Sequence, residues 1–201
     1  MPERVEHIFA IDSDDTVGCE ALANYQPKIV QQVGLGCVGA WNEAAKHATG
    51  DILVQLSDDW VPVKGWDVVF EQRMGSLSKP KVLVISDGHR KDDLLCMAIV
   101  NRKRMEQQGW FLPPAYTGVY SDDEFSFRAY EDGVTVDARD VVLTHEHPNY
   151  DANVPMDDTY EKQNSNARYA EAKRIFLERN PGAKKRWFIQ GNWSERKWLP
   201  K

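Results

Sequence analysis

The chain has 201 residues, of which 42% are hydrophobic and 28% are charged, and its formal net charge is −6. This length suits one domain with an extension, and the composition is that of a globular protein whose core needs no disulfides. Residues 171–201 carry nine Lys or Arg and three Glu, which leaves −12 for the rest of the chain. Such an acidic body argues against a nucleic-acid groove spread over the fold and suits a protein that collects cations.

Cysteine usage and hydropathy indicate the compartment. The cysteines Cys19, Cys37 and Cys96 are odd in number and form no C-x-x-C pair, which favours a reducing compartment. The first residues, MPERVEH, contain no long apolar segment, so we expect no signal peptide. The longest clearly apolar run, LLCMAIV, is far shorter than the ~20 residues of a membrane helix. We therefore expect a cytoplasmic protein without a membrane span.

The pattern of apolar residues predicts strands that alternate with helices. In chain order, we expect a strand over residues 5–11, a helix over 37–48, a strand over 51–56, a helix over 65–74, strands over 81–85 and 94–100, helices over 101–108 and 121–130, short strands over 134–136 and 141–144, and a helix over 158–177. In the helix over 121–130, Ser121 is the expected N-cap and Glu124 completes a capping box. This order predicts an α/β fold with a mixed, mostly parallel sheet.

Acidic clusters follow two of the predicted strands. Asp12 and Asp14 follow the first strand in IDSDDT, and Asp58 and Asp59 follow the strand ILVQL. In such sheets ligands bind beyond the carboxyl ends of strands, so we expect both clusters at one edge. Adjacent carboxylates are either a solvated turn or a site for Mg²⁺ or Mn²⁺, ions that commonly bridge protein carboxylates to substrate phosphates.

Two later segments add candidate side chains. If THEH continues the strand over 141–144, His145 and His147 point to the same side and can ligate a metal together. The alternative is a pair of surface histidines beside a proline turn. Asp122 lies in the first turn of a predicted helix, where a partly exposed carboxylate stays ionised. It is either part of a capped helix start or a general base for a reacting hydroxyl.

In this order, the segments resemble the family-2 glycosyltransferases, which have the GT-A nucleotide-sugar-binding fold. The similarity comprises the strand that ends in IDSDDT, the segment GCVGAWNEAAKHATGDILVQL, the D-x-D-like SDDW, a helix start in which Arg128 follows Asp122 by six residues, and a late His145. It covers roughly residues 5–160. The resemblance implies a three-layer, Rossmann-like GT-A sandwich over residues 1–180 that lacks the family's usual first strand.

The resemblance also implies roles for individual residues. Along the chain these are nucleotide binding by Asp12, Asp14, Asn42 and Asp58, metal ligation by Asp59, a catalytic base at Asp122, and metal or phosphate contacts by His145 and His147. The implied activity is the Mn²⁺- or Mg²⁺-dependent transfer of a sugar from a nucleoside-diphosphate sugar, expected to be UDP-linked, to a hydroxyl acceptor. Two alternatives stay open: a catalytically weak UDP- and metal-binding module, and, more distantly, a nucleotidyltransferase, for which VGLGCVG is a poor phosphate loop.

The basic tail over residues 181–201 is rich in tryptophan. Trp187, Trp193 and Trp198 are three of the seven tryptophans in the chain. Their rings either pack back on the domain, contact another copy in a homo-oligomer, or form a platform for a sugar ring. We favour the packed arrangement.

Overall fold

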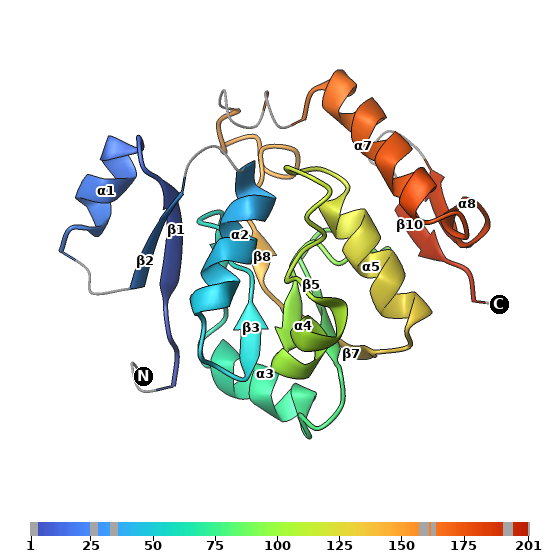
Figure 1. Cartoon of the computed structure of the whole chain (residues 1–201), viewed down its shortest axis with the longest axis horizontal. Helices are drawn as coiled ribbons and strands as arrows, with labels where there is room; N and C mark the ends of the chain where they lie inside the picture. The colour runs from blue at the N-terminus through green and yellow to red at the C-terminus, as the bar shows by residue number, and fades with distance from the viewer. Residues whose placement is uncertain are drawn as a thin grey trace.

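The computed structural model describes residues 4–24, 28–32, 36–156, 161, 164–190 and 195–200. Its central four-stranded sheet has the order β3 (Ile52–Val54), β6 (Ile99–Asn101), β5 (Val82–Ser86) and β7 (Thr135–Val142), and Figure 1 shows it between helical layers. The α/β class and the mixed sheet are confirmed. The mostly parallel arrangement is wrong for this sheet, because β6 is antiparallel to both of its neighbours and only β5 and β7 pair in parallel.

Strand direction nevertheless brings three loops to one edge of the sheet. β3 and β5 are both antiparallel to the strand between them, β6, so they run in the same direction. β7 runs parallel to β5. The carboxyl ends of β3, β5 and β7 therefore lie at the same edge, and the segments that follow them meet there.

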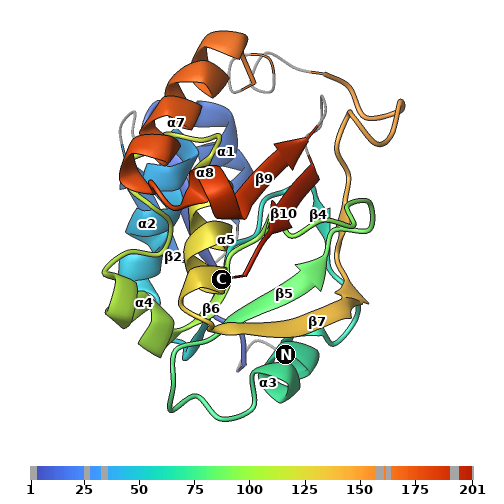
Figure 2. The ribbon, with the colours of Figure 1, turned by 90° about the vertical axis from the view of Figure 1, so that its right-hand side faces the viewer.

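Alternating side chains give the sheet two apolar faces, as a period of two requires. Val82 and Val84 of β5 belong to one core cluster, and Leu83 between them belongs to the other. The first cluster is covered by α2 (Gly36–His47), α4 (Arg102–Gln108), α5 (Ser121–Glu131) and α7 (Asn166–Arg179), and the second by α3 (Trp66–Met74). Figure 2 shows these layers on opposite sides of the sheet.

The N-terminal segment forms a separate small sheet. β1 (Ile8–Asp12) pairs in parallel with β2 (Lys28–Gln32), and among the described residues this pair is not hydrogen-bonded to the central sheet. Part of the expected acidic loop is instead the helix α1 (Thr16–Leu22). It begins there because the Asp15 carboxylate accepts a hydrogen bond from the Gly18 N–H at 2.8 Å, which caps the first turn.

Two further antiparallel pairs were not predicted. β4 (Trp60–Val61) pairs with β8 (Thr144–His145), and thereby joins the loops that follow β3 and β7. Near the C-terminus, α8 (Ala183–Arg186) leads into a hairpin of β9 (Trp187–Gln190) and β10 (Glu195–Trp198). Figure 2 shows this hairpin beside α5.

Two predicted elements are shorter than expected. The strand expected over 94–100 forms only at Ile99–Asn101, because side chains take the earlier amides: Leu95 N–H donates to Ser126 Oγ at 2.8 Å, and Ala98 N–H to Gln55 Oε1 at 3.0 Å. The helix expected over 158–177 is described from Asn166 to Arg179, and residues 157–160 and 162–163 lie outside the described ranges. No helix in those ranges combines the length and apolar character that crossing a membrane requires.

Candidate metal and catalytic site

The loops after β3 and β7 bring Asp59 and His145 into contact. His145 Nε2 lies 2.9 Å from Asp59 Oδ2, although 86 residues separate the two in sequence. The β4–β8 pairing fixes this approach, since Trp60 is opposite His145 in the ladder and their rings stack at 4.4 Å. Both side chains are mostly buried, with 21% of Asp59 and 16% of His145 exposed. A carboxylate and an imidazole are thus held at the carboxyl edge of the sheet.

Three more rings surround this pair. The His147 ring lies 5.0 Å from the His145 ring, so the expected grouping of the two histidines is confirmed. His147 Nδ1 accepts the Asn149 N–H at 3.2 Å, which leaves the proton of the neutral ring on Nε2. Burial, and then the nearby His145, lower the pKa of His147, so this imidazole is neutral at pH 7. Tyr150 stacks on His89 at 4.2 Å.

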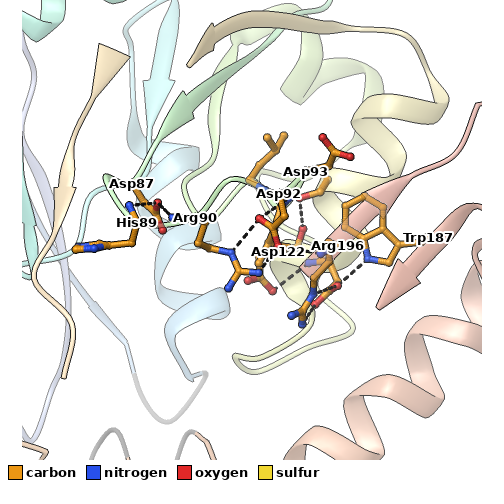
Figure 3. A network of polar contacts seen from close by, with 12 residues as sticks. Asp87, His89, Arg90, Asp92, Asp93, Asp122, Trp187 and Arg196 are labelled. Atoms are coloured by element: carbon orange, nitrogen blue, oxygen red, sulfur yellow. Dashed lines mark hydrogen bonds and ion pairs between the residues drawn. The ribbon is translucent and has the colours of Figure 1, made fainter. Parts of the chain in front are cut away.

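The loop after β5 supplies the third part of the site. Asp87 Oδ1 accepts the N–H groups of His89 at 2.9 Å and Arg90 at 2.7 Å, which closes a tight turn. His89 Nε2 lies 3.1 Å from the His145 carbonyl oxygen, so the loop touches the Asp59–His145 region. At its other end, Arg90 forms two contacts with Asp92, one of them from Nε at 3.0 Å. Figure 3 shows this loop between His89 at one end and Arg196 at the other.

Asp122 lies at the same edge, because α5 precedes β7 and runs back against it. Its carboxylate accepts the Asp123 N–H at 3.0 Å. The side chain is half-buried rather than freely exposed, and burial, followed by the charge of Asp123, raises the pKa of Asp122 to about 6. The expected partial exposure of Asp122 is therefore confirmed, and the raised pKa is what the sequence analysis did not anticipate. A carboxylate with this pKa is a stronger base, and it remains mostly ionised at pH 7.

The start of α5 differs from the predicted capping box. Ser121 is the first helical residue, and the cap position belongs to Tyr120 in the left-handed conformation, with φ 68°. This conformation costs a bulky residue about 1–3 kcal/mol. Burial of the Tyr120 ring against Tyr169 and Phe176 holds it in place. The backbone that enters the Asp122 turn is thus fixed by packing, which local sequence preferences do not predict.

Arg128, which follows Asp122 by six residues in the motif, is paired with Glu124. Its Nε donates to Glu124 Oε1 at 2.8 Å. Glu124 is fully buried and also accepts hydrogen bonds from Arg179 and the Tyr116 hydroxyl. Arg128 therefore compensates a buried charge one turn into the helix and stabilises α5.

A cavity of about 260 Å³ lies beside the loop after β5. Its walls include Trp60 from one side of the site, and Asp87, Arg90 and Cys96 from the loop and the segment after it. Pockets for whole drug-sized ligands are typically ~300–1,000 Å³, so this cavity suits a single ring or a small group.

The other residues with expected nucleotide roles make no hydrogen bond or ion pair to Asp59, His145 or Asp122 in the described chain. The Asn42 amide donates to the carbonyls of Val38 and Leu112 and accepts the N–H groups of Phe111 and Leu112, so its hydrogen-bonding capacity is used, and three of these four bonds hold a loop against α2. Asp58 is exposed. Asp12 ends β1 in the small sheet with Asp14 beyond it, and in the described chain no hydrogen bond or ion pair links either to Asp59, His145 or Asp122.

The donor atoms at the site limit what metal chemistry is available. Within the described ranges, no group of three His, Cys, Asp or Glu side chains is arranged to hold a metal ion. The Asp59 oxygen suits a hard ion that takes its other ligands from water and substrate phosphates, as Mg²⁺ usually does, whereas the His145 nitrogen suits a softer transition-metal ion better than Mg²⁺. An ion at this position would replace the proton now shared by the pair.

Comparisons of the chain with protein-family models, with curated proteins and with solved structures found no match. The fold itself defines the class of protein as α/β with a mixed sheet.

The loop after β5 was not among the expected site segments. Its sequence, SDGHRKDD, is turn-like, and in the structure Asp87, His89, Arg90 and Asp92 connect the two parts of the site. The signal was present, since this is a third polar segment directly after an apolar strand, like IDSDDT and SDDW. The segment SDGHRKDD has no counterpart among the glycosyltransferase motifs.

Proposed function

We propose that the protein is a GT-A-type glycosyltransferase that depends on Mn²⁺ or Mg²⁺. It would move a sugar from a nucleoside-diphosphate sugar, with UDP the expected carrier, to a hydroxyl acceptor. The observation that carries this proposal is the 2.9 Å contact of Asp59 with His145 at the sheet edge where α5 begins, with Asp122 in its first turn. A cation-binding pair and a carboxylate base at one strand edge are the parts that such a transfer needs.

The chemistry divides between these residues. Asp59 and His145 would hold the cation, which when bound neutralises charge on the departing diphosphate. His147 presents an Nε2–H that can donate to a phosphate oxygen, since its Nδ1 accepts the Asn149 N–H. The ionised Asp122 carboxylate would take the proton of the acceptor hydroxyl as the acceptor oxygen bonds to the anomeric carbon. The bond from that carbon to the diphosphate breaks in the same step, which inverts the configuration.

A second candidate function is a catalytically weak module that binds UDP and a cation. The observation in its favour is the position of Asp12, which ends a strand of a small sheet that shares no hydrogen bond with the central sheet in the described residues, with Asp14 just beyond it. Nucleotide binding by the Asp59 region alone would then survive without efficient transfer.

Titration of uridine, guanosine and adenosine diphosphates, each with Mn²⁺ and with excess chelator, tests both candidates. We expect UDP to bind only with the cation, because Asp58 and Asp59 repel a diphosphate without a counter-ion. Turnover of a panel of UDP-sugars then separates the two candidates. Cation-dependent binding without hydrolysis or transfer favours the module, and equal UDP binding in chelator contradicts both.

A further inference from the structure

The C-terminal hairpin is bonded directly to the start of α5. Arg196 of β10 donates from Nε to Asp123 Oδ1 at 2.9 Å and from Nη2 to Asp123 Oδ2 at 3.1 Å, which makes a bidentate ion pair. Trp187 of β9 donates from Nε1 to Asp123 Oδ1 at 2.7 Å. Asp123 is 1% exposed and Arg196 is 7% exposed. The charge next to Asp122 is therefore compensated by residues from the far end of the chain.

The same hairpin also fixes the loop after β5. Arg196 N–H donates to Asp92 Oδ2 at 2.8 Å, and the Arg196 carbonyl accepts the Asp93 N–H at 2.8 Å. Trp198 N–H donates to Asp93 Oδ2 at 2.9 Å. Figure 3 shows Arg196 between the loop and Trp187, with Asp122 close by. One arginine thus ties together the base-bearing helix and a wall of the cavity.

Several groups face Asp122 from the elements around it. They are Asp123 and Tyr120 at the start of α5, Arg196 of β10, Arg90 and Cys96 from the segment after β5, Cys37 of α2 and Tyr169 of α7. Asp123 raises the pKa of Asp122, whereas Arg196 and Arg90 lower it. Asp123 and Arg196 are bonded to each other, so their opposite effects on the neighbouring carboxyl come from one ion pair.

We propose that Arg196 is a positioning residue for Asp122, which it orients and keeps ionisable through its buried pair with Asp123 and the hydrogen bond of that pair to Trp187. The inference rests on the proposed function, in which Asp122 is the base. It gives the basic tail a task beyond packing: the hairpin completes the catalytic side of the site. Without it, Asp122 would adjoin an uncompensated buried carboxylate, and two adjacent carboxylates resist simultaneous ionisation.

Charge-neutral variants of the pair test this inference in the full chain. We expect Arg196→Gln to move the acidic limb of the kcat/KM profile to higher pH by roughly one unit, because a stabilising cation is lost. Asp123→Asn should move the limb to lower pH, because the repelling charge is lost. The double variant removes both charges, keeps groups that can hydrogen-bond to each other, and should titrate close to the parent; it also serves where Arg196→Gln alone does not fold.

The matched control is Arg186→Gln. Arg186 lies in the same C-terminal segment and is also ion-paired, but its partner Glu131 is nine residues along α5 from Asp122, about 13 Å along the helix axis. We expect no shift of the acidic limb in this variant. A shift as large as that of Arg196→Gln would overturn the inference, because any loss of positive charge would then suffice.

Carboxyl-carbon NMR provides a readout that needs no turnover. The Asp122 signal is identified by its loss in Asp122→Asn, and its titration is followed in the parent and in each variant. Shifts of opposite sign for Arg196→Gln and Asp123→Asn support the inference. An unmoved titration in Asp123→Asn, or a double variant that shifts as far as Asp123→Asn alone, overturns it. Opposite shifts in a protein that turns over no nucleotide sugar support the charge coupling and refute the proposed function instead.

Discussion

The Asp59–His145 region and the Asp122–Asp123 region lie at the same sheet edge but are built differently. The first is formed by two loops that follow strands of the central sheet, and its side chains retain partial contact with solvent. The second combines a helix start, the loop after β5 and a hairpin from the end of the chain, and its ion pair is almost completely buried. One region can therefore exchange ligands easily, whereas the other is held rigid.

The difference between the two regions shows that buried and partly exposed charges have different roles in a site. The partly exposed Asp59 and His145 contribute less to stability than a fully buried ion pair, because water competes for both side chains. Removal of one partner from a buried pair such as Asp123–Arg196 strongly destabilises the fold, because the other partner is left as an uncompensated buried charge. We expect substitutions in the first region to affect ligand binding, and substitutions in the second to affect both stability and the rate of reaction.

The largest expected effect is on turnover, and it tests the role given to the second region. Asp122→Asn keeps the size of the side chain but removes the base, which typically contributes ~10²–10⁴-fold in rate. We expect a loss of this order in kcat with unchanged affinity for UDP and Mn²⁺. Asp140→Asn, at an exposed aspartate paired with Arg73, is the control and should leave kcat unchanged. A parent-like rate in Asp122→Asn would mean that this residue is only part of the helix start.

The free energies of unfolding of one variant from each region test the contrast between the two regions. Asp123→Ala leaves the Arg196 guanidinium buried without its partner, so we expect a loss of about 3–5 kcal/mol in the free energy of unfolding. Asp59→Ala removes one member of a pair that retains contact with solvent, and should cost about 1 kcal/mol. Urea unfolding of both variants measures the difference. Similar losses would show that the two regions are equally important for the fold.

Cation binding tests the first region alone. Loss of even a supporting residue around a metal commonly costs ~10–100-fold in affinity, so removal of the carboxylate in Asp59→Ala should weaken Mn²⁺-dependent UDP binding by about 100-fold or more. Calorimetric titration with and without chelator measures this effect, and Asp140→Asn again serves as the control. Parent-like binding by Asp59→Ala would remove SDDW from the cation site.

The smallest expected effect is on pH dependence. The pKa of Asp122 is raised from 3.8 to about 6, so kcat/KM should fall about tenfold per pH unit below pH 6, where the base is protonated. Because the folded-state value is the higher one, the stability that this group contributes is complete below pH 3.8 and is lost as the pH rises through 6. The parent should therefore lose stability relative to Asp122→Asn between pH 4 and pH 6, as urea unfolding at both values would show. An acidic limb near pH 4 would contradict this environment.

The sequence by itself determined the elements whose signals are local. The apolar runs, their period and their polar ends predicted β3, β5, α2, α3 and α5 within a few residues, whereas the grouping of Asp59 with His145 was implied only by the family resemblance. Only the tertiary structure decided the antiparallel direction of β6 and its short length, because Ser126 and Gln55 take amides that would otherwise extend the strand. It also decided the environment of Asp122, since the Arg196 that compensates Asp123 lies 73 residues away along the chain. Periodicity reports which face of an element is buried, but it carries no information about which distant charge will meet which, and the pKa of a carboxylate depends on that.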